Sequence, residues 1–191
     1  MSEKNKVMFG ISNVHFGTYS VADDGTVTLG TPVKVPGTVN MTLEPESEEV
    51  VFYADNRKYW TTYSDNGYTG ELENALFDEA FKKTFLGYRD FPGGGIAEVK
   101  GATRPKVYMC FQAEGDIDAR RAIVYNVTLG KINREHATTE DTTEPGTATL
   151  PFTVSGDEGT NITRVEFKPG DENYDTLFTT PPVPELPDES E

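Results

Sequence analysis

The residues of this 191-residue chain that could do chemistry are few and scattered. His15 and His136 are its histidines, and Cys110 is its single cysteine. Neither histidine has another histidine or a cysteine at the short spacing that metal sites use, so we expect no bound metal. One thiol excludes an internal disulfide, and its place in a strand-like run predicts an inert core cysteine.

Other catalytic patterns are missing from the sequence as well. The run Gly93-Gly94-Gly95 is not followed by the Gly-Lys-Ser/Thr of a phosphate-binding loop, and no Gly-x-Ser-x-Gly motif occurs. The chain has 32 acidic residues, which could in principle supply a paired acid and base, but no other catalytic signature accompanies them. We therefore predict a protein that is not an enzyme and that uses no cofactor.

The charge balance narrows the possible partners. The 17 basic and 32 acidic residues give a formal net charge of −15. Because Lys and Arg supply most of the affinity for phosphates, we expect no surface that grips nucleic acid, although an acidic protein can lie beside DNA without adhering to it. We find no apolar leader after Met1 and no run that could span a bilayer, which predicts a cytoplasmic chain without a membrane.

The predicted fold is organised around the aromatic-rich region 52–88, where we expect a core or an interface because aromatic side chains carry the largest burial energies. Turn signals divide the region, since Asp55-Asn56 and Asn66-Gly67 both tolerate positive φ. The pattern predicts a three-stranded meander made of Val50–Ala54, Arg57–Tyr63 and Tyr68–Ala75.

A short helix is predicted directly after this meander. Asp78 is a suitable N-cap, and Gly87 supplies the stop. Phe77, Phe81 and Phe85 recur every four residues and form one aromatic stripe, so we expect them to face the core, with the helix covering an open end of the sandwich. A compatible interpretation is that one edge of the helix also packs on a neighbouring subunit.

The remaining sequence predicts a mainly β fold. Scarce leucine, abundant Thr, Val, Tyr and Phe, and 18 glycines with 12 prolines favour many short strands and turns. We expect an antiparallel β-sandwich or partly closed barrel over residues 1–180 with one short flanking helix. Residues 181–191 are rich in proline and acid and are predicted to be a disordered tail. Further expected strands are Lys6–Phe9, Val14–Val21, Thr26–Leu29, Pro32–Val35, Thr38–Leu43, Ile96–Lys100, Lys106–Gln112, Ala122–Leu129, Thr147–Val154 and Ile162–Phe167.

Two polar stretches, Glu44–Tyr63 and Asn133–Pro145, are longer than an isolated sandwich needs. The acidic run Glu44–Glu49 can be a solvated hairpin tip or a loop that contacts another subunit. The candidate residues for contact between subunits are Glu44, Glu46, Glu48, Glu49, Tyr59, Trp60, Thr139, Glu140 and Asp141.

Several motifs, taken in order, resemble a known family. They are KNKVMFGISNVHF near the start, FYADN, NGYTGELENAL before a helix that ends in FLG, FQAEGD, VYN and TTEDTTEP. Their order and spacing resemble the major tail proteins of long-tailed bacteriophages, in particular the phi13-type group from phages of Gram-positive bacteria. The resemblance runs from about Lys4 to Phe152.

This resemblance implies a structural subunit of the virion tail. Six copies would form a ring, and stacked rings would form a non-contractile tail tube, assembled in the host cytoplasm. The implied partners are further copies of the chain, the tape-measure protein, and the tail terminator and distal tail proteins. Double-stranded DNA would pass through without specific binding, past a channel wall that we expect to be acidic or neutral, with acidic residues alternating with Thr.

Two other functions fit the same features. One is the ring protein of a type VI secretion system or of a phage-derived contractile device. The other is a monomeric carbohydrate-binding module of about 21 kDa, in which Tyr59, Trp60 and Tyr63 would form the sugar platform.

Overall fold

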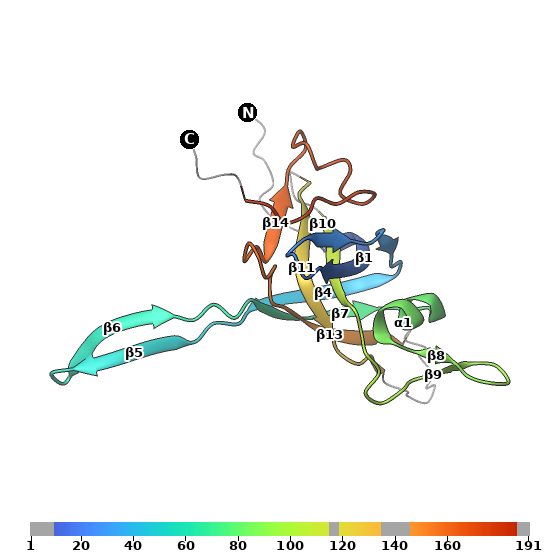
Figure 1. Cartoon of the computed structure of the whole chain (residues 1–191), viewed down its shortest axis with the longest axis horizontal. Helices are drawn as coiled ribbons and strands as arrows, with labels where there is room; N and C mark the ends of the chain where they lie inside the picture. Colours follow the sequence, from blue (N-terminus) through green and yellow to red (C-terminus); the bar gives the residue numbers. More distant parts are fainter. Residues whose placement is uncertain (1–9, 115–118, 135–145, 187–191) are drawn as a thin grey trace, which may run out of the picture.

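The computed structural model describes residues 10–114, 119–134 and 146–186. This part of the chain is mainly β, with one helix, and ten of its strands join in a single antiparallel sheet that does not close into a barrel. The sheet bends sharply and packs on itself, which gives the predicted sandwich of two layers (Figure 1).

The first layer, here called the β10 layer, is built on three long strands. Strand β10 (Lys106–Ala113) lies between β1 (Ile11–Val21) and β11 (Arg121–Leu129). Three short strands extend its margins: β2 (Val27–Leu29) and β3 (Val33–Lys34) pair with β1, and β14 (Arg164–Phe167) pairs with β11.

The second layer, the β7 layer, has four strands. Strand β7 (Tyr68–Asn74) pairs with β4 (Thr38–Pro45) on one side and with β13 (Ala148–Val154) on the other. Strand β12 (Asn133–Arg134) pairs with the far edge of β13.

The two layers are joined where β11 changes direction. Asn126 has a φ of 51°, and its side-chain amide donates a 2.7 Å hydrogen bond to the carbonyl of Gly156. Beyond this residue the end of β11 pairs with β13, so that Val127 lies opposite Val154. A strand that bends and crosses between sheets is the usual corner of such a sandwich.

The main core fills the space between the layers and extends under the helix. Helix α1 (Glu79–Leu86) begins at Asp78, whose carboxylate accepts a 2.7 Å hydrogen bond from the Phe81 amide, and ends at Gly87 with a φ of 71°. Phe77, Phe81 and Phe85 are all buried, and Phe16 from β1 packs against the last two rings.

A second core covers the opposite face of the β10 layer. Tyr108, Ile123 and Tyr125 are buried there against Leu177 of the C-terminal segment. Arg121 holds the C-terminal segment on the sheet through two contacts. Its guanidinium donates a 2.6 Å hydrogen bond to the Tyr174 carbonyl and lies 4.0 Å from the centre of the Tyr174 ring. Tyr174–Phe178 therefore packs on the sheet as a series of turns.

The domain boundary proposed at residue 180 stays a prediction. The structure describes residues 181–186, in which Pro184 is buried and the Pro182 carbonyl accepts a 2.8 Å hydrogen bond from the Tyr125 hydroxyl. The expected strand Lys6–Phe9 lies outside the described residues.

The predicted three-stranded meander is wrong in its third member. Strands β5 (Glu49–Ala54) and β6 (Arg57–Tyr63) form a separate two-stranded sheet, whereas β7 belongs to the main sheet. Asn66-Gly67 is therefore not a hairpin turn. A local turn signal cannot reveal that β7 finds better partners in β4 and β13, which are distant in the sequence. A further small hairpin pairs β8 (Arg89–Asp90) with β9 (Ile96–Ala97), so the predicted strand Ile96–Lys100 is shorter than expected.

Candidate assembly surfaces

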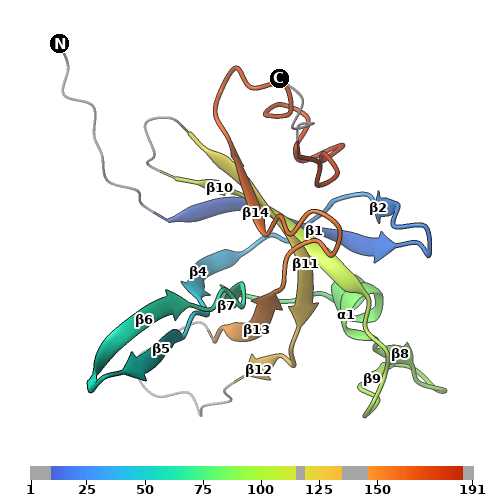
Figure 2. The same ribbon diagram turned by 60° about the vertical axis from the view of Figure 1, so that its left-hand side comes forward.

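A long hairpin projects from the β7 layer, and we call residues 46–67 the arm. It consists of β5 and β6 together with the segments 46–48 and 64–67 that lead into and out of them. Figures 1 and 2 show it leaving the body on the side away from α1. At about 3.3 Å per residue, the nine residues from 46 to 54 reach about 30 Å beyond the end of β4.

The two segments at the base of the arm are bonded to each other. The Glu46 amide donates to the Gly67 carbonyl, and the Asn66 amide donates to the Glu46 carbonyl, both at 2.9 Å. The Ser64 amide donates to the Glu48 carbonyl at 2.9 Å as well. The ladder of β4 and β7 therefore continues into that of β5 and β6, and the arm is an extension of the sheet.

The tip of the arm is the predicted turn at Asp55-Asn56. Their φ angles of 52° and 58° fit a two-residue hairpin turn in which both central residues are left-handed. A bulge follows, because Phe52 lies opposite Trp60 while Tyr53 lies opposite Lys58. Lys58 forms a 3.1 Å ion pair with Glu49 across the strands.

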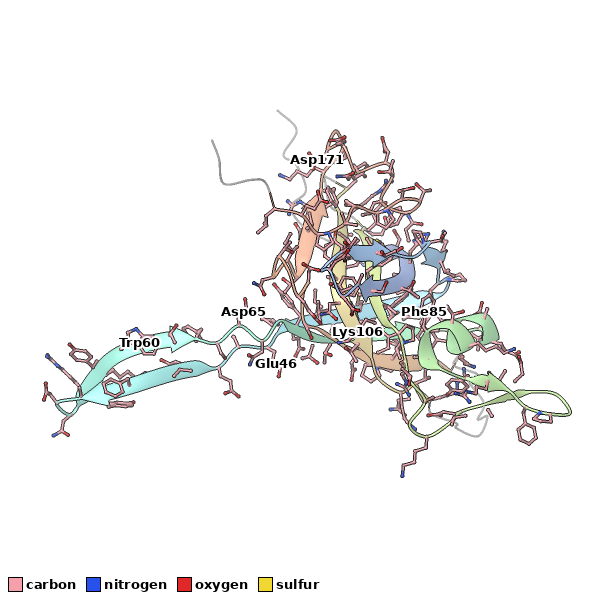
Figure 3. The ribbon with its side chains drawn as sticks, viewed as in Figure 1. Glu46, Trp60, Asp65, Phe85, Lys106 and Asp171 are labelled. Carbon is pink, nitrogen blue, oxygen red and sulfur yellow. The ribbon has the colours of Figure 1, made fainter. Side chains whose placement is uncertain are left out.

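The arm exposes an unusual amount of aromatic surface. Trp60 is 54% exposed and Tyr63 is 68% exposed, although both lie in regular strand. Figure 3 places Trp60 far out along the arm, while Glu46 and Asp65 lie near its junction with the body. The other aromatic side chains of the arm, each more than half exposed, are Phe52, Tyr53 and Tyr59.

The predicted acidic loop is a set of strand and arm positions. Glu44 lies in β4, and Glu46 and Glu48 lie in the segment that leads into the arm. The interpretation of Glu44–Glu49 as a hairpin tip is therefore wrong, since the tip lies at Asp55-Asn56. Of the other contact candidates, Tyr59 and Trp60 lie on the arm, whereas Thr139, Glu140 and Asp141 lie outside the described residues.

The outward face of the β7 layer is a second candidate surface. Inward positions of β7 and β13, such as Leu72, Leu150 and Phe152, are buried in the core. The residues between them point the other way, because side chains alternate along a strand. In register, these outward positions form three rows: Asn40, Glu73 and Thr149; Thr42, Glu71 and Pro151; and Glu44, Thr69 and Thr153.

This outward face is acidic and rich in Thr. Its three carboxylates come from Glu44, Glu71 and Glu73, and the nine positions of the rows include no Lys or Arg. The Thr147 hydroxyl donates a 2.6 Å hydrogen bond to Glu73. The alternation in Thr69-Gly-Glu-Leu-Glu-Asn74 could have marked this face in the sequence, but the pairing that brings the three strands together could not be read there.

The residues singled out for chemistry have structural roles. Cys110 is fully buried, and burial raises the pKa of its thiol. The His15 ring donates a 2.7 Å hydrogen bond from Nδ1 to the Asn13 carbonyl and stacks on Phe178 at 4.8 Å, and burial lowers its pKa. His136 lies outside the described residues.

Within the described ranges, no group of three or more His, Cys, Asp or Glu residues is arranged to hold a metal ion. The described helix is too short and too polar to cross a membrane.

Comparisons with known proteins give a weak structural likeness. No family model and no curated protein matches the sequence. Among solved structures, the chain is similar to the tube-terminating cap of the anti-feeding prophage, with 7% identity and a TM-score of 0.49 over 88% of this chain and 97% of the cap. At this level of similarity, neither fold nor function is transferred from the cap to this chain.

Proposed function

We propose that this protein is a structural subunit of a phage-type tail tube, in which six copies form a ring and rings stack into a non-contractile tube. The observation that carries the proposal is the arm, a projecting hairpin that exposes five aromatic side chains. The order of the sequence motifs described above supports the same family of assemblies.

The arm needs a covering surface. A two-stranded hairpin is at best marginally stable alone in water, and exposed apolar patches of this kind usually mark interaction sites. The arm is also bonded into the β7 layer, so it cannot fold back on its own body without breaking that ladder. Another copy of the chain is the partner that a homopolymeric tube provides, either in the same ring or in the next one.

The edges of the β7 layer support ring closure. Among the described residues, the layer ends at β4 on one side and, on the other, at β12 and the last residues of β11, which both pair with β13. A free strand edge is a ready site for pairing with another chain. If β4 of one subunit lies beside β12 of the next, the contact is head-to-tail, and a rotation that closes gives a ring. Six β7 layers would then form one continuous sheet around a channel.

The outward face of the β7 layer is suited to line such a channel. Its Glu44, Glu71 and Glu73 would present negative charge to the lumen. Basic walls would bind DNA through release of counterions, and even a weak attraction repeated along a long tube would retain the genome. Salt screens repulsion over about 8–10 Å, so an acidic wall keeps DNA away without a large barrier to entry. The tape-measure protein would occupy the same channel during assembly, and tail terminator and distal tail proteins would contact the ends.

The ring protein of a secretion or contractile device would use the same edges and arm, and this alternative differs in its partners and not in its fold. A monomeric carbohydrate-binding module fits less well. Trp60 and Tyr63 are three residues apart in a regular part of β6, so their side chains point to opposite faces and do not form one sugar platform.

Sedimentation velocity over a range of protein concentrations tests the proposal. We expect a species far larger than the 21.1 kDa monomer whose fraction rises with concentration. A monomer at every concentration would contradict the proposal and would favour the carbohydrate-binding alternative, which predicts a single slow species.

A further inference from the structure

An apolar groove of about 370 Å³ lies between helix α1 and the segment that joins β3 to β4. Its floor is formed by the buried rings of Phe81 and Phe85, and its helix side by the small residues Ala80 and Thr84. Its rims carry two apolar side chains that are open to solvent, Val33 at 46% and Leu76 at 59% exposed. The helix therefore turns one face to the core and leaves its neighbouring face without a cover.

Two polar side chains lie behind one wall of the groove. Gly37 and Ala75 line this wall, and next to them lie Thr38 and Asn74, which face each other across β4 and β7. Asn74 is fully buried and its amide nitrogen donates to the Leu76 carbonyl at 2.7 Å. The Asn74 Oδ1 and Thr38 Oγ1 atoms have no hydrogen-bond partner within the described part of the chain.

We propose that this groove receives the arm of a second copy of the chain, with Trp60 seated over Phe81 and Phe85. The inference rests on the proposed function, because it identifies the surface that covers the arm in the assembly. Trp60 is the single tryptophan of the chain, and it combines a large apolar ring with one N–H donor. Such residues are the usual anchors of protein interfaces when they enter a pocket.

The positions of the two surfaces favour contact between copies. The arm leaves the body on the side away from α1 in both views, so the groove and the arm of one copy cannot meet (Figures 1 and 2). A contact between two different surfaces is head-to-tail and continues from copy to copy. Arg57 at the arm tip has no acidic partner among the described residues, and the groove is lined by one acidic residue, Asp78, and one basic residue, Lys34.

Cysteine cross-linking between two variants tests the contact. Ala54→Cys places a thiol on the arm, at the β5 residue next to the turn. Ala54 is on the same strand face as Phe52, and Phe52 lies opposite Trp60 on β6. Ala80→Cys lies in the groove, and the native Cys110 is fully buried, so it does not interfere. An equal mixture of the two variants, assembled and then oxidised, should give a disulfide-linked dimer on a non-reducing gel, whereas each variant alone should not.

A matched mixture replaces Ala54→Cys by Phe91→Cys, at the tip of the β8–β9 hairpin, where the side chain is 62% exposed. This pair should not cross-link, and a link from Phe91→Cys in place of Ala54→Cys would assign the groove to that hairpin and overturn the proposal. If the wild-type protein assembles but Ala54→Cys and Ala80→Cys do not cross-link, the groove contact is overturned while the proposed tube subunit stands. If wild-type protein fails to assemble at all, both proposals fall.

Blocking the groove gives an independent test. Ala80→Arg is an exposed helix substitution, so we expect an unchanged circular dichroism spectrum and unfolding midpoint, but loss of the large species in sedimentation. Val21→Arg, a substitution of similar size at an exposed site on β1, is the control and should assemble normally. Emission from Trp60 in wild-type protein should move to shorter wavelength on assembly, and Ala80→Arg should abolish this shift. Normal assembly and a normal shift in Ala80→Arg would overturn the proposal.

Discussion

The amide of Glu46 donates a 2.9 Å hydrogen bond to the carbonyl of Gly67, and this bond joins the arm to the main sheet. The next pair toward the body is Pro45 with Tyr68, at the end of the ladder between β4 and β7. The direction of the arm is therefore set by the β7 layer. In an assembly, this layer and the arm would move as one unit, so contacts made by the arm would also fix how neighbouring β7 layers meet.

Shortening the arm should separate folding from assembly. We expect a variant in which Glu49–Tyr63 is replaced by a two-residue Asn-Gly turn to keep the body folded, because no side chain of this stretch belongs to either core cluster. Its unfolding midpoint in urea should match that of the wild type, while sedimentation should show loss of the large species.

The control for this variant removes the tip of the β8–β9 hairpin, Phe91–Gly95, which also projects from the body (Figure 1). This variant should assemble. If the arm-shortened protein still forms large species, the arm is not the contact between copies.

Phe81→Ala should destabilise the body by about 3–5 kcal/mol, since truncation of a buried Phe removes transfer energy and leaves a cavity. Phe81 is 4% exposed and its ring lies 5.3 Å from that of Phe16 and 5.0 Å from that of Phe85. Urea unfolding is the measurement. Thr84→Ala, an exposed change on the same helix, is the control and should shift the free energy of unfolding by less than about 0.5 kcal/mol. Equal effects of the two substitutions would contradict the placement of the helix.

Asp157 should make stability depend on pH in the acid range. Burial by itself raises the pKa of this carboxyl, but hydrogen bonds from the Tyr19 hydroxyl, the Thr160 amide and hydroxyl and the Gly159 amide outweigh it, so the net pKa is lowered. A lowered folded-state pKa stabilises the protein above the unfolded value of about 3.9, and this contribution is lost as pH falls through the folded value.

The variant Asp157→Asn measures this contribution. At pH 7 we expect a loss of about 1–3 kcal/mol, because the buried Tyr19 hydroxyl and the loop amides lose a charged acceptor. The difference between wild type and variant should shrink as pH is lowered from 5 toward 3. A difference that stays constant over this range would assign the effect to packing and not to the charge.

The acidic face of the β7 layer should keep assemblies free of DNA. Wild-type assemblies should not retain short double-stranded DNA at low salt, whereas Glu44→Lys with Glu71→Lys should retain it in a salt-dependent manner. Glu79→Lys on the exposed side of α1 changes the charge elsewhere and should have no such effect. Retention of DNA by wild-type protein, measured by co-sedimentation, would contradict the channel assigned to this face.

The sequence predicted the local features of this fold well. Asp78 and Gly87 bound the helix as expected, and Asp55-Asn56 forms the turn between two strands. These features depend on residues within a few positions of each other. The pairing of β7 depends on residues far away in the sequence, because β4 precedes it and β13 follows it at a long distance. The equally strong turn signal at Asn66-Gly67 therefore predicted the wrong pairing.

The contact role of the candidate residues stays a prediction. Tyr59 and Trp60 were proposed as contact residues, and both are exposed on the arm. Strand propensity alone cannot distinguish an exposed arm from a core strand, because Tyr, Trp, Thr and Val favour both. The groove was not predicted, since Val33 and Ala80 meet through the packing of α1 beside the β3–β4 connection and nothing in their local sequence indicates it.

Electron microscopy of the concentrated protein in negative stain tests the central claim most directly. We expect rings with six-fold rotational symmetry and an open channel, together with stacks of these rings, and we expect the arm-shortened variant to give neither. Isolated particles of about 21 kDa, with no rings at any concentration, or rings whose averaged end views lack six-fold symmetry, would contradict it.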